Sequence, residues 1–182
     1  MDLRDVVAMV KRDHASINAD FARLARRGDA SPELFSDVAT RLIRHEVAEE
    51  IALYPALHGV DDGKLAEPRL SEQAEIESRL YRLERAGFDE AVLQPELADL
   101  WSTVFDHSER EEAEVLPLVA VALPQLERIK LGRLYARVRD TAPNRPRPQA
   151  GAEPTANTII GPLATLADWI RDCARGSVWQ AS

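Results

Sequence analysis

A chain of 182 residues is long enough for one domain with a substantial buried core. Charged residues make up 30% of the chain and aromatic residues only 5%, which favours an all-α protein because β-domains are richer in aromatic and β-branched side chains. The formal net charge of −8 argues against a general nucleic-acid binder and against docking on anionic lipid, since both need a concentrated basic face.

The first residues and the cysteine content indicate the compartment. Charges at Asp2, Arg4 and Asp5 interrupt any apolar signal core, and no stretch reaches the length of a membrane span. The single cysteine, Cys173, can form no intramolecular disulfide and cannot supply a thiolate metal cluster. We therefore expect a soluble, cytoplasmic protein with no membrane partner.

Two amphipathic helices are predicted in the first third of the chain. The first spans about residues 3–26, with apolar side chains at the helical period. Ser31 is a typical N-cap with Pro32 at the first helical position, so a second helix begins there. We expect Pro55 to disturb this helix and a loop to follow over residues 58–64.

Three further helices are predicted: one over about residues 68–86, one that opens near Pro95, and one over about residues 124–139. Four long helices joined by short connections predict an up-down-up-down antiparallel four-helix bundle. The fifth helix is then an addition at the C-terminal side of the bundle.

The composition changes after Thr141. Residues 143–157 hold four prolines in fifteen positions and predict an extended linker. Residues 161–173 form a short amphipathic segment that either docks on the bundle, the simpler expectation, or binds a partner. We expect a helical bundle domain over residues 1–140 and, over residues 141–182, a Pro-rich extension with a short C-terminal helix.

The chain contains an internal repeat. Residues 45–57, HEVAEEIALYPAL, align without gaps with residues 107–119, HSEREEAEVLPLV, and share His, Glu-Glu and Pro at the same spacing. The preceding helices repeat as well, and their alignment places Gln73 where the first helix hairpin has His14. The chain is therefore read as two hairpins related by pseudo-symmetry.

Each copy of the repeat carries a His-x-x-x-Glu pair: His45 with Glu49, and His107 with Glu111. This spacing stacks both side chains on one helix face, here the apolar face that must turn towards the core. A buried carboxylate is costly without a partner, and a cation offsets that cost. Imidazole and carboxylate together suit iron, manganese or zinc. The two pairs, with His14 on a matching stripe, predict a metal site.

Each candidate also has a simpler interpretation. A single His-x-x-x-Glu is usually a solvated pair, and His14 alone would be a satisfied core histidine; two copies in register on core stripes favour metal. His58 borders the predicted loop and is expected at the surface. Glu50 and Glu112 lie one residue off the ligand face, so we expect them to be solvated or to support the ligands through hydrogen bonds.

These residues resemble the pattern of the hemerythrin-like, HHE cation-binding family over about residues 5–120. The family has a His on helix one, His-x-x-x-Glu on helix two, a His on helix three and His-x-x-x-Glu on helix four. The corresponding residues here are His14, His45, Glu49, Gln73, His107 and Glu111. The Pro-rich extension also resembles bacterial, especially actinobacterial, members. The resemblance implies a non-haem centre of two irons, bridged by Glu49 and Glu111, that meets dioxygen, peroxide or nitric oxide.

Gln73 departs from the family pattern. An amide oxygen is a weak, neutral donor, so the iron beside the third helix would lack a ligand. Tyr54 could compensate as a phenolate, which is a good ligand of ferric iron, and so could Glu77, on the same helix face as Gln73. The simpler interpretation of Tyr54, and the preferred one, is an ordinary packed aromatic side chain. The site can instead hold one metal, or an asymmetric pair with an open position.

Two classes of function follow. The first is a di-iron protein that binds or turns over dioxygen, peroxide or nitric oxide; since no separate nucleophile or acid–base constellation is evident in the sequence, any enzymatic activity would belong to the metal. The second is a regulatory or interaction bundle whose metal is structural, single or lost. The missing histidine, the acidic surface, and Trp169 and Trp179 near the C-terminus favour this alternative.

Overall fold

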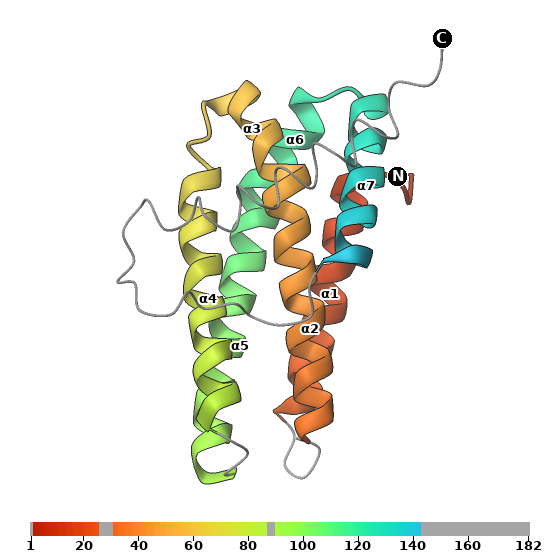
Figure 1. The fold of residues 1–182 in the computed structure, drawn as a ribbon. Coiled ribbons are helices and arrows are strands. Elements are labelled where there is room, and N and C mark those ends of the chain that lie inside the picture. The colour runs from red at the N-terminus through yellow and green to blue at the C-terminus, as the bar shows by residue number, and fades with distance from the viewer. Residues whose placement is uncertain (1, 26–30, 87–89, 143–182) are drawn as a thin grey trace. The chain divides into compact units, whose positions relative to one another are not determined.

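The computed structural model describes residues 2–25, 31–86 and 90–142, and the regular secondary structure in these ranges is entirely helical (Figure 1). In chain order the helices, with η marking a π-helical turn, are α1 (Val6–Leu24), α2 (Pro32–Ala48), η1 (Glu49–Leu53), α3 (Tyr54–Asp61), α4 (Ala66–Ala86), α5 (Glu90–Arg110), η2 (Glu111–Val115), α6 (Leu116–Ala122) and α7 (Gln125–Thr141). The all-α prediction is confirmed.

The four long helices α1, α2, α4 and α5 form an antiparallel bundle. Helix α1 packs against α2 and α5, and α4 packs against α5 and α2, so the four close a ring. Figure 1 shows α1 and α4 running in one direction and α2 and α5 in the other. Helix α7 lies outside this ring and packs against α1 and α2. The predicted up-down-up-down bundle with an added fifth helix is confirmed.

Side-chain caps determine where the first two helices begin. The Asp5 carboxylate accepts a hydrogen bond from the Val7 N–H at 3.0 Å, and the Ser31 hydroxyl accepts one from the Leu34 N–H at 3.1 Å. Each cap satisfies a backbone donor that has no partner within the first helical turn. Pro32 occupies the first helical position, as predicted.

The helix is disturbed next to Pro55, as predicted, by the π-helical turn η1, but the loop predicted over residues 58–64 begins later because α3 continues to Asp61. The prediction that the following long helix opens near Pro95 is wrong, because α5 begins at Glu90 and contains Pro95. A proline has no N–H to donate and its ring crowds the carbonyl four residues earlier. Just before Pro55 the chain adopts the π-helical turn η1, in which the Tyr54 N–H bonds to the Glu49 carbonyl five residues back.

The two π-helical turns are the structural counterpart of the sequence repeat. η1 begins at Glu49 and η2 at Glu111, and each is followed by an α-helix with a proline in its first turn, Pro55 or Pro117. In η2 the Leu116 N–H bonds to the Glu111 carbonyl, again five residues back. Such turns are rare and occur frequently at functional sites. Here each begins at a carboxylate that sequence analysis proposes as a ligand.

A layer of buried polar side chains separates two apolar clusters. One cluster includes Leu53, Leu57 and Tyr135, and the other includes Phe21 and Leu42. Between the residues that the four helices contribute to these clusters lie the buried polar residues His14, His45, Glu49, Gln73, His107 and Glu111. The polar layer is therefore enclosed by apolar side chains on both sides along the bundle axis.

None of the helices in the described ranges combines the length and the apolar character needed to cross a bilayer. The predicted linker over residues 143–157 and the amphipathic segment over residues 161–173 lie outside the described residues. Their docking on the bundle stays a prediction.

Candidate metal centre

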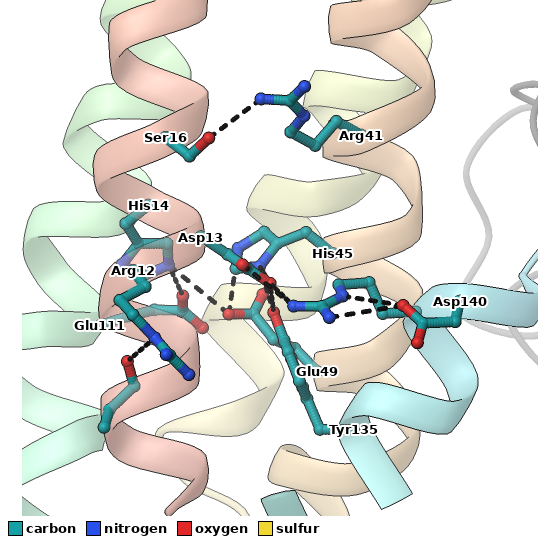
Figure 2. Close-up of polar contacts among 12 residues, drawn as sticks. Arg12, Asp13, His14, Ser16, Arg41, His45, Glu49, Glu111, Tyr135 and Asp140 are labelled. Atoms are coloured by element: carbon teal, nitrogen blue, oxygen red, sulfur yellow. Dashed lines mark hydrogen bonds and ion pairs between the residues drawn. The ribbon is translucent and has the colours of Figure 1, made fainter. Parts of the chain in front are cut away.

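Four buried side chains from α1, α2, η1 and η2 converge in the polar layer. His14, His45, Glu49 and Glu111 each offer one ligand atom, and these atoms all lie within 4.8 Å of one another. Nε2 of His14 lies 3.2 Å from Oε2 of Glu111 and 3.5 Å from Oε1 of Glu49, while Nε2 of His45 lies 3.2 Å from the same Glu49 oxygen. Figure 2 shows both imidazoles directed at the two carboxylates.

His107 lies on the other side of Glu111. Its Nε2 atom is 3.6 Å from Oε2 of Glu111, the oxygen that also faces His14. His107 is buried, at 2% exposure, although it does not belong to the group of four atoms described above. Glu111 is therefore placed between two imidazoles from different helices.

Gln73 and Tyr54 contact the remaining carboxylate oxygens. Nε2 of Gln73 donates hydrogen bonds to Oε2 of Glu49 at 2.9 Å and to the Tyr54 hydroxyl at 2.8 Å. The Tyr54 hydroxyl in turn donates to Oε1 of Glu111 at 2.6 Å. Gln73 thus points into the core, as the repeat predicts, but it presents its amide N–H groups to the acceptors. Burial and the charges of Glu111 and Glu49 raise the pKa of Tyr54 well above its usual value, so its hydroxyl is protonated in this arrangement.

The other sequence candidates do not belong to this group of ligand atoms. His58 is exposed beside Gly63, as expected for a surface residue. Glu50 and Glu77 are half-buried, and burial together with the charge of Glu77 raises the pKa of Glu50 to about 7. Glu112 is half-buried and serves as a supporting residue, because its Oε1 atom lies 3.1 Å from Nδ1 of His14.

Each of the three imidazoles is held at Nδ1 by a partner outside the centre. Glu112 holds His14 at 3.1 Å, Glu72 holds His107 at 2.9 Å, and the Tyr135 hydroxyl holds His45 at 2.6 Å. These contacts leave Nε2 of every ring directed at the carboxylates. Hydrogen-bonding partners of this kind set the tautomer and orientation of ligand histidines.

Sequence reasoning missed Glu72, Asp13 and Tyr135. The repeat contained a signal for the first two, because the aligned segments place Asp13 and Glu72 one residue before His14 and Gln73. Glu72 contacts His107 directly, and Asp13 accepts a hydrogen bond from Tyr135 at 2.7 Å. Tyr135 lies 90 positions from His45 in a different helix, and no local pattern marks that pairing.

The two central carboxylates have pKa shifts of opposite direction. Burial and the charge of Glu111 raise the pKa of Glu49 well above its usual value. Burial would also raise the pKa of Glu111, but the nearby His14 imidazole, 3.2 Å away, and the charge of His107 outweigh it and hold that pKa at about 2. The two carboxyl groups therefore ionise in different pH ranges, Glu111 before Glu49 as the pH rises.

The pKa values of the neighbouring imidazoles of His14 and His45 are also shifted in opposite directions. Burial would lower the pKa of His14, but the neighbouring carboxyl groups of Glu111, Glu112 and Glu49 outweigh burial and raise it well above 6.5. Burial and the neighbouring charge of His14 lower the pKa of His45 well below 6.5. His45 is therefore neutral around pH 7, as a ligand must be, whereas His14 favours its protonated form, and a bound cation would displace that proton.

Several atoms that face the centre have no hydrogen-bond partner among the described residues. They are Nε2 of His14, Nε2 of His107, Oε1 of Glu49 and Oε2 of Glu111. Buried polar atoms without partners are costly, and native structures contain few of them. A divalent cation would satisfy them together, and a set of imidazole and carboxylate donors suits iron, manganese or zinc. The residues present therefore fit a metal ion.

Comparison with known proteins agrees with this geometry. Residues 5–119 match the hemerythrin HHE cation-binding domain. The chain is also similar to an uncharacterized hemerythrin-like protein of Schizosaccharomyces pombe, with 25% identity over 172 residues that cover 88% of this chain and 82% of that protein. No solved structure matches the chain. Because the matched segment spans more than half of the chain and contains all the buried residues of the polar layer, the chain belongs to the hemerythrin HHE cation-binding domain family.

Proposed function

We propose that this protein is a non-haem iron protein whose centre binds or reacts with dioxygen, peroxide or nitric oxide. The observation that carries the proposal is the enclosed polar layer, in which imidazole nitrogens and carboxylate oxygens without hydrogen-bond partners face one another. Membership of a cation-binding family supports a metal there, and the donor types suit iron, manganese or zinc. The similarity to hemerythrin-like proteins is what favours iron among these metals.

The proposed centre holds two irons in unequal surroundings. His14 and His45 would hold the first iron, and His107 the second, with Glu49 and Glu111 shared between them. The position of Glu111 supports this arrangement, since one of its oxygens faces both His14 and His107. Bridging carboxylates of this kind are known in the cores of helical bundles.

Tyr54 is the proposed substitute for the ligand that Gln73 does not supply. Its hydroxyl already contacts Glu111 at 2.6 Å and accepts a hydrogen bond from Gln73 at 2.8 Å. Without a cation, burial and the nearby carboxylates keep its pKa well above the usual value, so it is a phenol. The positive charge of a bound ferric ion would lower this pKa and favour the phenolate form of Tyr54 over the phenol.

The protein itself contributes orientation and exclusion of water. The apolar clusters on either side of the polar layer shield it from solvent, and the Nδ1 partners fix the imidazole rings. Bound iron would supply a redox-active centre with a coordination position open to a small ligand. Where Tyr54 stays a phenol and does not bind the metal, the place of the missing imidazole beside α4 is the open position.

A second candidate function is a regulatory or interaction bundle with a single, structural metal. One observation favours it. Gln73 donates a hydrogen bond to Oε2 of Glu49, and Tyr54 donates one to Oε1 of Glu111. These are the carboxylate oxygens that a second metal would need as ligands. In this alternative the protein's own hydrogen bonds replace the second metal, and His14, His45, Glu49 and Glu111 hold the only ion.

The two candidates differ in their response to small oxidants. The full-length protein would be loaded with ferrous iron in the absence of air and then exposed separately to dioxygen, hydrogen peroxide and nitric oxide. The proposed function predicts new visible absorption bands with at least one of the three reagents. A protein that retains its iron and shows an unchanged spectrum with all three supports the structural metal instead.

A further inference from the structure

The three imidazoles of the centre do not have the same kind of partner at Nδ1. Carboxylates from α4 and η2 hold His107 and His14, whereas a phenol from α7 holds His45. That phenol belongs to Tyr135, which lies beyond residues 5–119, the segment that matches the family domain. Tyr135 is fully buried, at 0% exposure. A helix outside the four-helix bundle therefore contacts a proposed ligand directly.

The direction of the hydrogen bonds at Tyr135 determines the tautomer of His45. The Tyr135 hydroxyl has one proton, and it donates that proton to Oδ2 of Asp13 at 2.7 Å. Nη1 of Arg139 lies 3.1 and 3.0 Å from the two Asp13 oxygens, so this carboxylate is held as an acceptor. The phenol oxygen must then accept from Nδ1 of His45. Nε2 of His45 is left with its lone pair towards Glu49 (Figure 2).

The sequence repeat shows why a tyrosine is needed at this position and nowhere else in the layer. Glu72, paired with Arg69 and Arg110, reaches His107 directly at 2.9 Å. Its counterpart Asp13 is shorter by one methylene group, and its Oδ2 atom is 4.0 Å from Nδ1 of His45, too far for a hydrogen bond. The Tyr135 hydroxyl lies between Asp13 and His45 and forms a hydrogen bond with each of them.

The packing of α7 against the start of α1 fixes the position of Tyr135 along the bundle axis, level with His45. A Cβ atom on Gly132, one helical turn before Tyr135, would lie 2.0 Å from the Arg4 carbonyl oxygen, so only glycine allows this close approach. Arg128, one turn earlier, bonds to Asp5 at 2.8 Å and to the carbonyls of Ala120 and Leu123. These contacts lock the register of α7 against the start of α1.

We propose that Tyr135 is a positioning residue of the metal centre, which holds His45 as the Nδ1-protonated tautomer with Nε2 available to the metal. Helix α7 is then part of the centre and not only a cover for α1 and α2. Because the phenol is neutral, it orients His45 without adding the negative charge that Glu72 and Glu112 bring to the other two rings. This inference rests on the proposed metal centre.

The first test uses the full-length protein loaded with Zn²⁺, which is diamagnetic, and ¹⁵N NMR of the histidine ring nitrogens. We expect His45 to carry its proton on Nδ1 and the metal on Nε2. If the wild-type protein binds no Zn²⁺, or any other divalent metal tried, the proposed centre itself fails. If it binds Zn²⁺ but His45 is protonated on Nε2, the centre stands and the role of Tyr135 is overturned. This outcome does not depend on whether any variant folds.

The second test compares the Zn²⁺ dissociation constants of three variants. Tyr135→Phe keeps the ring and removes the hydroxyl, and we expect it to weaken binding about 10- to 100-fold, the usual effect of losing such a partner. Tyr81→Phe removes a hydroxyl that accepts a hydrogen bond from Arg85 at the surface of the bundle, away from the polar layer, and this variant should bind as the wild type does. Asp13→Glu combined with Tyr135→Phe should recover affinity, because the longer acid can reach His45 as Glu72 reaches His107.

A folded Tyr135→Phe protein with wild-type affinity and an unchanged His45 tautomer would overturn the inference. Circular dichroism of each variant shows whether its helices are intact. Equal losses of affinity in Tyr135→Phe and Tyr81→Phe would also overturn it, because the loss would then not depend on the contact with His45.

Discussion

Gln73 donates one amide hydrogen bond to Glu49 at 2.9 Å and another to Tyr54 at 2.8 Å, so the residue that replaces a histidine in the repeat acts as a donor in the core. Replacing it by histidine would restore the symmetry of the two hairpins. We expect Gln73→His to bind the second iron more tightly and, if the open position admits peroxide, to react with peroxide more slowly. Iron titrations and peroxide consumption of the loaded protein measure the two effects.

Tyr54→Phe is the paired variant, because it removes only the hydroxyl that contacts Glu111. If Tyr54 is the substitute ligand, this variant loses phenolate-to-iron absorption and binds the second iron more weakly. Suppose instead that neither Gln73→His nor Tyr54→Phe alters iron stoichiometry, affinity or spectrum. The side of the centre beside α4 then contributes no ligand, and a single-metal centre replaces the di-iron proposal.

The histidines of the polar layer should be far more sensitive to substitution than the exposed one. His45→Ala should remove most bound metal and lower the melting temperature, because the buried carboxylates Glu49 and Glu111 lose their counter-charge. His58→Ala should do neither, since His58 is exposed. Elemental analysis and thermal denaturation of both variants check this. Equal metal loss in the two variants would show that the site has been placed wrongly.

The metal-free and metal-loaded proteins should respond to pH in opposite ways. In the metal-free protein, prepared by treatment with a chelator, the pKa of His14 is raised well above 6.5, that of Glu49 well above 4.5 and that of Glu50 to about 7. The folded state therefore holds more protons than the unfolded state above pH 6.5, where the lowered pKa of His45 no longer matters. Its unfolding free energy should fall as the pH rises from 6.5 to about 8, by about 1.4 kcal/mol per pH unit for each proton retained only on folding.

Bound metal displaces these protons, so its affinity rises over the same pH range. The metal-loaded protein should keep its melting temperature or gain stability where the metal-free protein loses it, and metal uptake at pH 7 should release a proton from His14. Denaturation of both forms from pH 6.5 to 8, with proton counting in weak buffer, tests this. Metal retention that is independent of pH down to roughly 4, the range of ordinary carboxyl groups, would count against histidine ligands.

The close approach of α7 to the N-terminal segment makes Gly132 sensitive to any side chain. A methyl group there would collide with the Arg4 carbonyl, so we expect Gly132→Ala to destabilise the protein by about 1–3 kcal/mol, the usual cost of overpacking. Gly59, inside α3, has no atom within 4 Å of its added Cβ. Gly59→Ala should therefore be neutral or stabilise by up to about 1 kcal/mol through helix propensity. Chemical denaturation distinguishes the two, and a stable Gly132→Ala protein would contradict the packing.

Helical periodicity and the repeat were sufficient to predict the bundle and to bring the candidate ligands together. Spacing by four residues on an apolar face leaves His45 and Glu49 one orientation, towards the core, and the structure buries both. The continuation of the helical chain beyond Pro55 to Asp61 was not predictable from local rules, because a proline ordinarily ends or kinks a helix. The π-helical turn η1, which comes directly before α3, changes that outcome.

The partners of the imidazoles differ in how far the sequence revealed them. Glu72 could have been found, since the repeat aligns it with Asp13 and each lies one residue before a candidate of the layer. Tyr135 could not, because its contact with His45 depends on the register of α7 against α1 and α2. Long-range hydrogen bonds of this kind follow from tertiary packing and have no periodic signature in the chain.

The most direct test of the account is the iron content of freshly purified full-length protein, measured by elemental analysis together with its visible spectrum. The account predicts about two irons per chain, by analogy with carboxylate-bridged centres in other bundles, and absorption from ligand-to-iron charge transfer. It also predicts that the iron is lost in His45→Ala. A colourless wild-type protein that is fully helical, and that takes up no iron when ferrous salt is supplied without air, would contradict it.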